Sequence, residues 1–280
     1  MSNNTYPYFN YLLSQFEKNN SGIEMSFGRH VHWGYWQDPS AAGITNDDYA
    51  GAAENLTRKI CDIADIRDSQ AILDAGCGFG GTIAHINENY QGMNLTGVNI
   101  DKRQLERAEK QVHARPGNNI TFIEADACTY VRNDLQFDRI LAVECIFHFP
   151  SRERFFELSH HSLKAGGNLT LSDFIPTAFF LPVAWMLSAR ALQKYSLFGR
   201  CNISYTLNKY SAMADKYGFK FTASDITSHT LPTYDYLKSI LRTSKNDVKL
   251  TQMALATINL TKFISRHGFL KYQILNFKKL

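Results

Sequence analysis

The chain has 280 residues, of which 44% are hydrophobic and 13% aromatic, and its formal net charge is +4. This length allows a complete α/β core with residues left over, and the small, scattered charge lacks the concentrated basic face expected of an enzyme that acts on nucleic acid. The most apolar stretch, residues 178–187, is shorter than the roughly 20 residues of a membrane-spanning helix, and a polar N-terminus with five cysteines that form no C-x-x-C pair predicts a cytoplasmic protein with reduced thiols.

Residues 1–55 are predicted to form an aromatic N-terminal lid. The segment begins with an amphipathic helix rich in tyrosine and phenylalanine. It continues with a cluster of two histidines and two aromatic residues, His30, His32, Tyr35 and Trp36. Such a cluster either packs on the core or closes over a ligand, and the number of its members favours contact with a ligand.

Residues 71–81 predict a buried parallel strand that ends in an acid and a glycine-rich turn. Asp74 precedes Gly76 and Gly78 at the edge where open α/β sheets bind ligands. A carboxylate beside backbone without Cβ atoms suits an ammonium group better than a pyrophosphate, and S-adenosylmethionine carries an ammonium. A dinucleotide fingerprint, G-x-G-x-x-G, has a different glycine spacing. A tight turn without any ligand is the remaining interpretation.

The next strands are predicted at residues 94–100, 120–124 and 137–143. Asn99 ends the first of them at the distance from the glycines where a polar group bonds the ribose hydroxyls. Asp126 follows the second, either against the adenine amino group or as a helix N-cap. The third strand runs into Glu144 and His148.

A fifth strand is predicted at residues 168–172, after a turn at residues 164–167, and ends at Asp173. Strands at residues 219–224 and 269–277 are expected to form an antiparallel pair at one sheet edge. The fold class is therefore α/β, a mostly parallel, doubly wound, Rossmann-like sheet. A single domain is predicted, with a lid (1–55), a cofactor-binding core (56–174), an aromatic substrate cap (175–217) and a C-terminal sheet edge with a helix (218–280).

The order of these motifs resembles class I S-adenosylmethionine-dependent methyltransferases, in particular the small-molecule branch that includes tocopherol, sterol, ubiquinone-type and natural-product sugar methyltransferases. The resemblance covers about residues 20–175, through the Asp74–Gly81 motif, the ribose strand with Gln104, the turn at residues 164–167 and an HxHxGYW segment at residues 30–36. It implies cofactor binding by Asp74, Gly76, Cys77, Gly78, Asn99, Ile100, Gln104, Asp126, Ala127, Glu144 and Tyr35. It implies acceptor contacts from His30, His32 and Trp36, and the cap adds Trp185 and Tyr205.

His148 and Asp173 are the predicted catalytic pair. A hydroxyl that attacks a sulfonium methyl benefits from a base within hydrogen-bond reach, and histidine has a suitable ordinary pKa. His148 and Asp173 would then be a base and its orienting carboxylate, or two alternative bases. The other interpretation is a loop histidine with a strand-end cap. His160 and His161 point in different directions on a helix, so no metal site is predicted.

Three hypotheses follow for the function. The first is methyl transfer to a hydroxyl of a small natural product in secondary metabolism, with an apolar or aromatic acceptor. The second keeps the cofactor but methylates a carbon of an isoprenoid or aromatic ring, a nitrogen or a carboxylate. The third is a non-catalytic S-adenosylmethionine-binding protein. A homodimer through the apolar cap is compatible with all three.

Overall fold

The computed structural model describes residues 7–130, 136–187, 201–243 and 248–280. Its centre is a seven-stranded sheet with the order β3-β2-β1-β4-β5-β7-β6. Five neighbouring strands run parallel, which confirms the predicted Rossmann-like, doubly wound fold class. They are β1 (Ala71–Ala75), β2 (Asn94–Asn99), β3 (Asn119–Glu124), β4 (Phe137–Ala142) and β5 (Leu163–Pro176).

The sheet ends in an antiparallel edge, as the sequence predicted. Strand β7 (Leu270–Lys279) is antiparallel to β5 on one side and to β6 (Phe219–Asp225) on the other. It pairs with β5 from Asn168 to Pro176, so β5 continues beyond residue 172, where the sequence suggested its end. The predicted turn at residues 164–167 appears as a break in the β4–β5 register, where Gly166 has a φ of +74°.

Helices cover the sheet and close one of its ends. Polar residues accept hydrogen bonds from the first turns of several of them, for example Thr45 at α3, Asp101 at α5 and Ser151 at α6. The helices are α1 (Pro7–Glu17), α2 (Ser21–Phe27), α3 (Asn46–Ala64), α4 (Gly81–Asn89), α5 (Lys102–Gln111), α6 (Arg152–Ser162), α7 (Leu181–Leu187), α9 (Leu207–Tyr217), α10 (Thr227–Thr230), α11 (Pro232–Thr243) and α12 (Val248–Arg266), with 3-10 turns η1 (Pro39–Ala41) and η2 (Ile146–His148).

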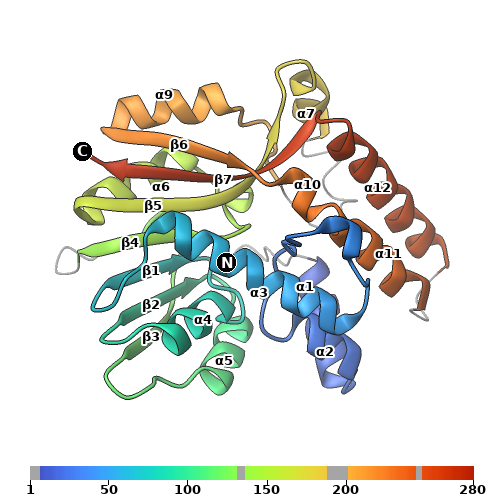
Figure 1. Ribbon diagram of the computed structural model, residues 1–280, viewed down its shortest axis with the longest axis horizontal. Coiled ribbons are helices and arrows are strands. Elements are labelled where there is room, and N and C mark those ends of the chain that lie inside the picture. The colour runs from blue at the N-terminus through green and yellow to red at the C-terminus, as the bar shows by residue number, and fades with distance from the viewer. Residues whose placement is uncertain (1–6, 131–135, 188–200, 244–247) are drawn as a thin grey trace.

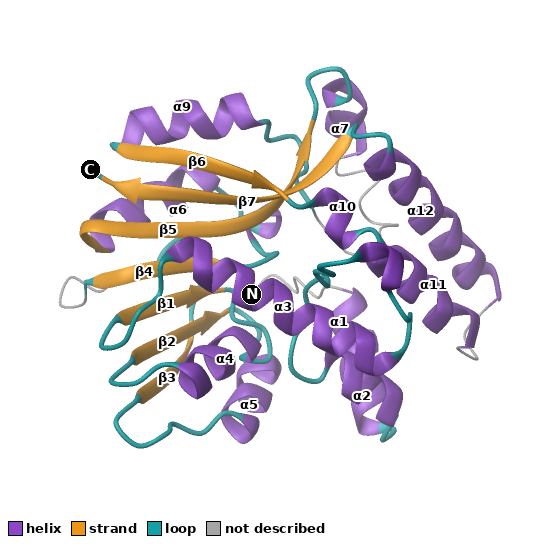
Figure 2. Cartoon of the chain, viewed as in Figure 1, coloured by secondary structure: helices purple, strands orange, loops and turns teal. Residues whose placement is uncertain are grey.

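Figure 1 shows that α1, α2, α11 and α12 lie beyond the carboxyl ends of the parallel strands. The strands occupy one half of the molecule and these helices the other (Figure 2). Helices α10 to α12 lie between β6 and β7 in the chain, within the segment predicted as a sheet edge with a helix. No described helix has the length and apolar character needed to cross a bilayer.

The core lies on both faces of the sheet, because its parallel strands are buried on both sides. On one face Phe277 packs edge-on against Phe156 and stacks on Phe221. On the other face α3 and α4 contribute Leu56, Ile60 and other apolar side chains to a second cluster. A third cluster joins α1 and α2 to Phe79 in the glycine-rich turn and to residues of α3 and α11. The N-terminal helices are therefore anchored directly to that turn.

We predict that Gly81→Ala destabilises the fold through the N-terminal segment. A Cβ at Gly81 would lie 2.4 Å from the carbonyl oxygen of Arg29 and 2.5 Å from Nδ1 of His30. We expect the variant to lose about 1–3 kcal/mol in the free energy of unfolding, measured by urea denaturation. Gly51→Ala is the matched control, because nothing lies within 4 Å of its Cβ and alanine favours the helix. Equal free energies of unfolding for Gly81→Ala and Gly51→Ala would contradict the close contact of Gly81 with Arg29 and His30.

Candidate functional site

A cavity of about 520 Å³ opens at the carboxyl ends of β1, β2 and β4. Its volume is within the range of roughly 300–1,000 Å³ typical of small-molecule sites. The strand order reverses between β1 and β4, which is where open α/β sheets bind their ligands. Asp74, Asn99 and Glu144, which lie at or just beyond these strand ends, all line the cavity.

The glycine-rich turn forms the floor of the cavity. Gly76, Gly78 and Gly80 have φ values of +81°, +55° and +80°, a conformation that favours glycine. A Cβ at Gly76 would lie 2.8 Å from Cβ of Cys145, so the turn also needs glycine for its approach to the end of β4. Gly76, Cys77 and Gly78 line the cavity as predicted.

Asp74 supplies a buried carboxyl group beside this turn. Its side chain is 1% exposed, and no described residue hydrogen-bonds its Oδ2 atom. Burial raises the pKa of the carboxyl group to about 7. A buried carboxyl group without a partner, next to a cavity, fits a cationic ligand group.

The end of the cavity where the sequence predicted ribose contacts is formed by polar side chains that bond to one another. Nδ2 of Asn99 donates to Oε1 of Gln104 at 3.0 Å, while Oδ1 of Asn99 accepts from the backbone N–H of Asp101. Asp126 lines the cavity and accepts from the N–H of Cys128, but the described residues after it form a turn at 127–129 and not the helix that the N-cap interpretation expected. Ile100 and Ala127 complete this end.

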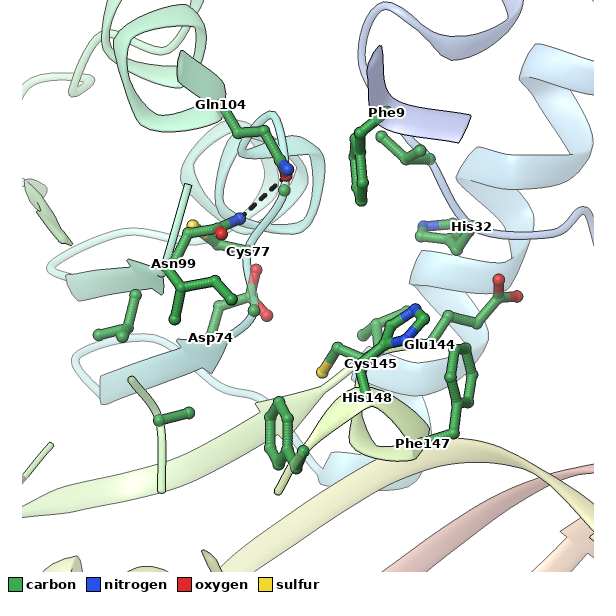
Figure 3. A pocket seen from close by; sticks show the side chains of 18 of the residues that line it. Phe9, His32, Asp74, Cys77, Asn99, Gln104, Glu144, Cys145, Phe147 and His148 are labelled. Carbon is green, nitrogen blue, oxygen red and sulfur yellow. Dashed lines mark hydrogen bonds between the residues drawn. The ribbon is translucent and has the colours of Figure 1, made fainter. Parts of the chain in front are cut away.

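The opposite wall carries His148 among aromatic side chains. Figure 3 shows Asp74, Asn99 and Gln104 on one side of the cavity and Phe9, His32, Glu144, Phe147 and His148 on the other. Nδ1 of His148 lies 3.7 Å from Sγ of Cys201, and the imidazole stacks beside Tyr8 at 6.3 Å between ring centroids. Trp185 of α7 also lines the cavity, although its side chain is 72% exposed.

His30 and His32 line the cavity with ring nitrogens that are bonded within the protein. Nε2 of His30 lies 2.6 Å from Glu54, and Nδ1 lies 3.3 Å from the hydroxyl of Thr57. His32 bonds the same hydroxyl through Nε2 and the carbonyl oxygen of Trp33 through Nδ1. Burial lowers the pKa of His32 to about 3, so it stays neutral. Both histidines therefore hold the lid segment on α3 and offer a ligand their ring surfaces.

Three of the residues predicted to bind cofactor or acceptor lie outside the cavity lining: Tyr35, Trp36 and Tyr205. After His32 the chain turns onto the core, where Tyr35 stacks on His229 and the indole N–H of Trp36 donates to Asp48. The hydroxyl of Tyr205 donates to Glu153. These three residues were expected to contact cofactor or acceptor, and the structure instead gives them packing contacts. Residues 188–200 of the predicted cap lie outside the described residues.

The structure does not bring Asp173 to the cavity as the partner of His148. Asp173 lies inside β5, opposite Gln273 of β7, and is fully buried. Its Oδ2 atom accepts hydrogen bonds from the Arg152 guanidinium and from the hydroxyl of Tyr210. Burial raises the pKa of the Asp173 carboxyl group and the Arg152 charge opposes that shift. The expectation that Asp173 orients His148 is therefore wrong in its geometry, because β5 extends past the predicted strand end.

Several lining residues were not identified from the sequence as site residues. They come from α1, the loop after β4 and the segment before α9, and include Tyr8, Phe9, Phe147, Phe149, Asn202 and Ser204. The aromatic periodicity of the N-terminal helix was visible in the sequence. Its approach to the cavity was not, because that depends on packing between distant segments.

Comparison with known proteins shows similarity to methyltransferases. Residues 72–167 match a methyltransferase domain family. The chain is 27% identical over 220 residues to the methyltransferase GfsG of Streptomyces halstedii, covering 78% of this chain and 76% of that protein. It is also 27% identical over 214 residues to the 27-O-demethylrifamycin SV methyltransferase of Amycolatopsis mediterranei, covering 76% and 75%. Other relatives are named as O- or N-methyltransferases.

Among solved structures, the fold is similar to that of the mycolic acid cyclopropane synthase CmaA1 complexed with S-adenosylhomocysteine. The TM-score is 0.75 at 16% identity, and the match covers 98% of this chain and 99% of that one. The geranyl diphosphate C-methyltransferase of Streptomyces coelicolor A3(2), at 14% identity and a TM-score of 0.69, was also solved with S-adenosyl-L-homocysteine, which is S-adenosylmethionine without its transferable methyl group. The cavity fits S-adenosylmethionine, because the unpartnered Asp74 carboxyl group matches the ammonium of the cofactor and the glycine turn leaves room for its chain.

We predict that Asp74 makes cofactor binding depend on pH. Burial raises its pKa to about 7, and an ammonium group requires the ionised form. The Kd of S-adenosylhomocysteine should therefore fall by about tenfold from pH 6 to pH 8 in calorimetric titrations. Asp74→Asn should remove this dependence, whereas Asp126→Asn at the ribose end should keep it. If the Kd of the Asp74→Asn variant fell with pH as it does in the wild type, Asp74 would not be the group that binds the ammonium.

We predict a structural role for Asp173. Removing its charge with Asp173→Asn leaves the Arg152 guanidinium, which is 2% exposed, without a counter-ion, so the free energy of unfolding should fall by about 3–5 kcal/mol. The control is Asp235→Asn, which breaks partly exposed pairs with Lys238 and Lys262 and should cost less than about 1 kcal/mol. Chemical denaturation measures both, and a fully stable Asp173→Asn protein would refute the structural role.

Proposed function

We propose that this class I S-adenosylmethionine-dependent methyltransferase transfers a methyl group to a hydroxyl oxygen of a small, apolar or aromatic natural product. The observation that carries the proposal is the position of His148 in the cavity wall that faces Asp74 and the glycine turn across the cavity. Tyr8, Phe147 and Trp185 line the same wall and favour an acceptor with apolar or aromatic surface.

The residues of the chain divide the work between the two ends of the cavity. Asp74 binds the ammonium group, and Asn99 with Gln104 binds the ribose hydroxyls. When bound, S-adenosylmethionine supplies an electrophilic methyl group on a positively charged sulfur. His148 removes the proton from the acceptor hydroxyl as the new oxygen–carbon bond forms, and the aromatic wall holds the acceptor in line.

Nitrogen methylation is the second candidate. The cavity lining contains three acidic residues, Asp74, Asp126 and Glu144, and several aromatic rings, a combination that also suits an acceptor amine. Relatives named as N-methyltransferases support this candidate through 34% identity over 137 residues in one case. Carbon and carboxylate methylation keep the same cofactor site.

A cytoplasmic location is supported by the absence of disulfides among the five cysteines.

The test of the proposal is a screen for S-adenosylhomocysteine formation. The panel holds phenols, aliphatic hydroxyl compounds, amines and carboxylates of similar size. For a hydroxyl acceptor, His148→Ala should lower kcat/KM by about two to four orders of magnitude while leaving the Kd of S-adenosylhomocysteine unchanged. His161→Ala, at an exposed position of α6, is the control and should keep full activity. A hydroxyl acceptor methylated equally well by His148→Ala would overturn the role of this residue, and turnover of amines or carboxylates alone would overturn the proposed acceptor.

A further inference from the structure

Glu144 combines a strained backbone with a place in the cavity wall. It lies two residues beyond the end of β4 and has a φ of +49°, in the left-handed region that non-glycine residues rarely adopt. Its backbone N–H donates to Oγ of Ser172 at 3.0 Å, which holds this conformation against the neighbouring strand. Backbone strain of this kind concentrates at functional sites, where the surrounding structure maintains it.

The Glu144 carboxyl group is fixed through only one of its oxygens. Oε1 accepts the backbone N–H of Trp33 at 2.7 Å and the hydroxyl of Tyr272 at 2.5 Å. One donor comes from the lid segment and the other from β7, so two distant parts of the chain hold the same atom. No donor among the described residues reaches Oε2, and none of their basic side chains forms an ion pair with this carboxyl group.

A buried carboxyl group without a cationic partner keeps its proton at neutral pH. Burial raises the pKa of Glu144 to about 8. The titratable groups around it are the phenols of Tyr49, Tyr234 and Tyr272, which stay neutral because their pKa values are raised, and His32 and His148 in the cavity wall. Because Oε1 already accepts two hydrogen bonds, the acid proton belongs on Oε2.

We propose that Glu144 contacts the acceptor as a neutral carboxylic acid, donating a hydrogen bond from Oε2 to an acceptor oxygen. The inference rests on the proposed hydroxyl methylation and adds a requirement on the substrate. The acceptor carries a second oxygen, as an ether, carbonyl or hydroxyl group, close to the hydroxyl that is methylated. His148 faces the reacting hydroxyl and Glu144 the second oxygen, so the two groups together select the position of methylation. No proton is transferred at Glu144 during the reaction.

The protonation state can be tested without any acceptor. Infrared spectra of the wild-type protein should contain the C=O stretch of a protonated acid that is lost in Glu144→Gln and that titrates near pH 8. Asp74→Asn should keep this band, which separates Glu144 from the second buried acid in the cavity. If Glu144→Gln removes no such band at pH 6, the carboxyl group is ionised and the proposal is overturned.

The contact is tested with two phenols of similar shape, 2-methoxyphenol and 2-ethylphenol, which differ in the second oxygen. Calorimetry measures their binding to the protein saturated with S-adenosylhomocysteine. The wild type should bind 2-methoxyphenol about five- to tenfold more tightly, which is the effect of one hydrogen bond. Glu144→Gln keeps an N–H donor and should keep the preference, whereas Glu144→Leu should lose it while its Kd for S-adenosylhomocysteine shows that the cofactor site is intact.

Each result bears on the proposal. Equal binding of the two phenols to the wild type, or no binding of either, overturns the contact. A preference lost in Glu144→Gln shows that a donor at this position does not make the contact and also overturns the proposal. These measurements use no turnover, so a failure of hydroxyl methylation in the acceptor screen is seen separately from a failure of Glu144 as a hydrogen-bond donor.

Discussion

The antiparallel pairing of β7 with β5 decides which polar side chains reach the cavity. The pairing continues from Asn168 to Pro176, past the point where β4 has ended. It therefore encloses Asp173 within the sheet and at the same time carries the Tyr272 hydroxyl to the Glu144 carboxyl group. One carboxyl group is removed from the site and another is fixed in its wall by the same strand.

The parts of the site that could be predicted from the sequence are those set by local signals. The apolar run of β1, Asp74 and the positive-φ glycines lie within a few residues of one another, so their arrangement follows from a strand followed by a turn. Asn99 and Asp126 could be placed because parallel strands end at the same edge of a sheet. The fold class followed from the alternation of strands and helices.

The parts that could not be predicted depend on contacts between distant segments. Asp173 looks like a strand-end acid until β7 pairs beside it, and its partner Arg152 is 21 residues away in the chain. Tyr35 and Trp36 belong to an aromatic segment that reaches the cavity at His32 and then leaves it, because the backbone N–H groups of Tyr35 and Trp36 bond to Ala52 and His229. No local pattern marks the residue at which such a segment turns away.

The protonation states of the Asp74 and Glu144 carboxyl groups suit the ligand groups that we propose for them. Asp74 is buried and Glu144 partly buried, and desolvation raises the pKa of both carboxyl groups, so each can hold its proton near neutral pH. A cation beside Asp74 would displace its proton and form a charge-assisted hydrogen bond. Glu144 is proposed to remain a neutral acid because desolvation by burial raises its pKa more than the hydrogen bonds from Tyr272 and Trp33 lower it. The two carboxyl groups thus differ in function because of their partners, although they face one cavity.

The wall opposite Asp74 is built from α1, η2, α7 and the segment before α9, which are far apart in the chain. Helix α1 also packs on Phe79 of the glycine turn, whereas a change in α7 or in the segment before α9 would, under the proposed function, reshape the acceptor wall without altering that contact.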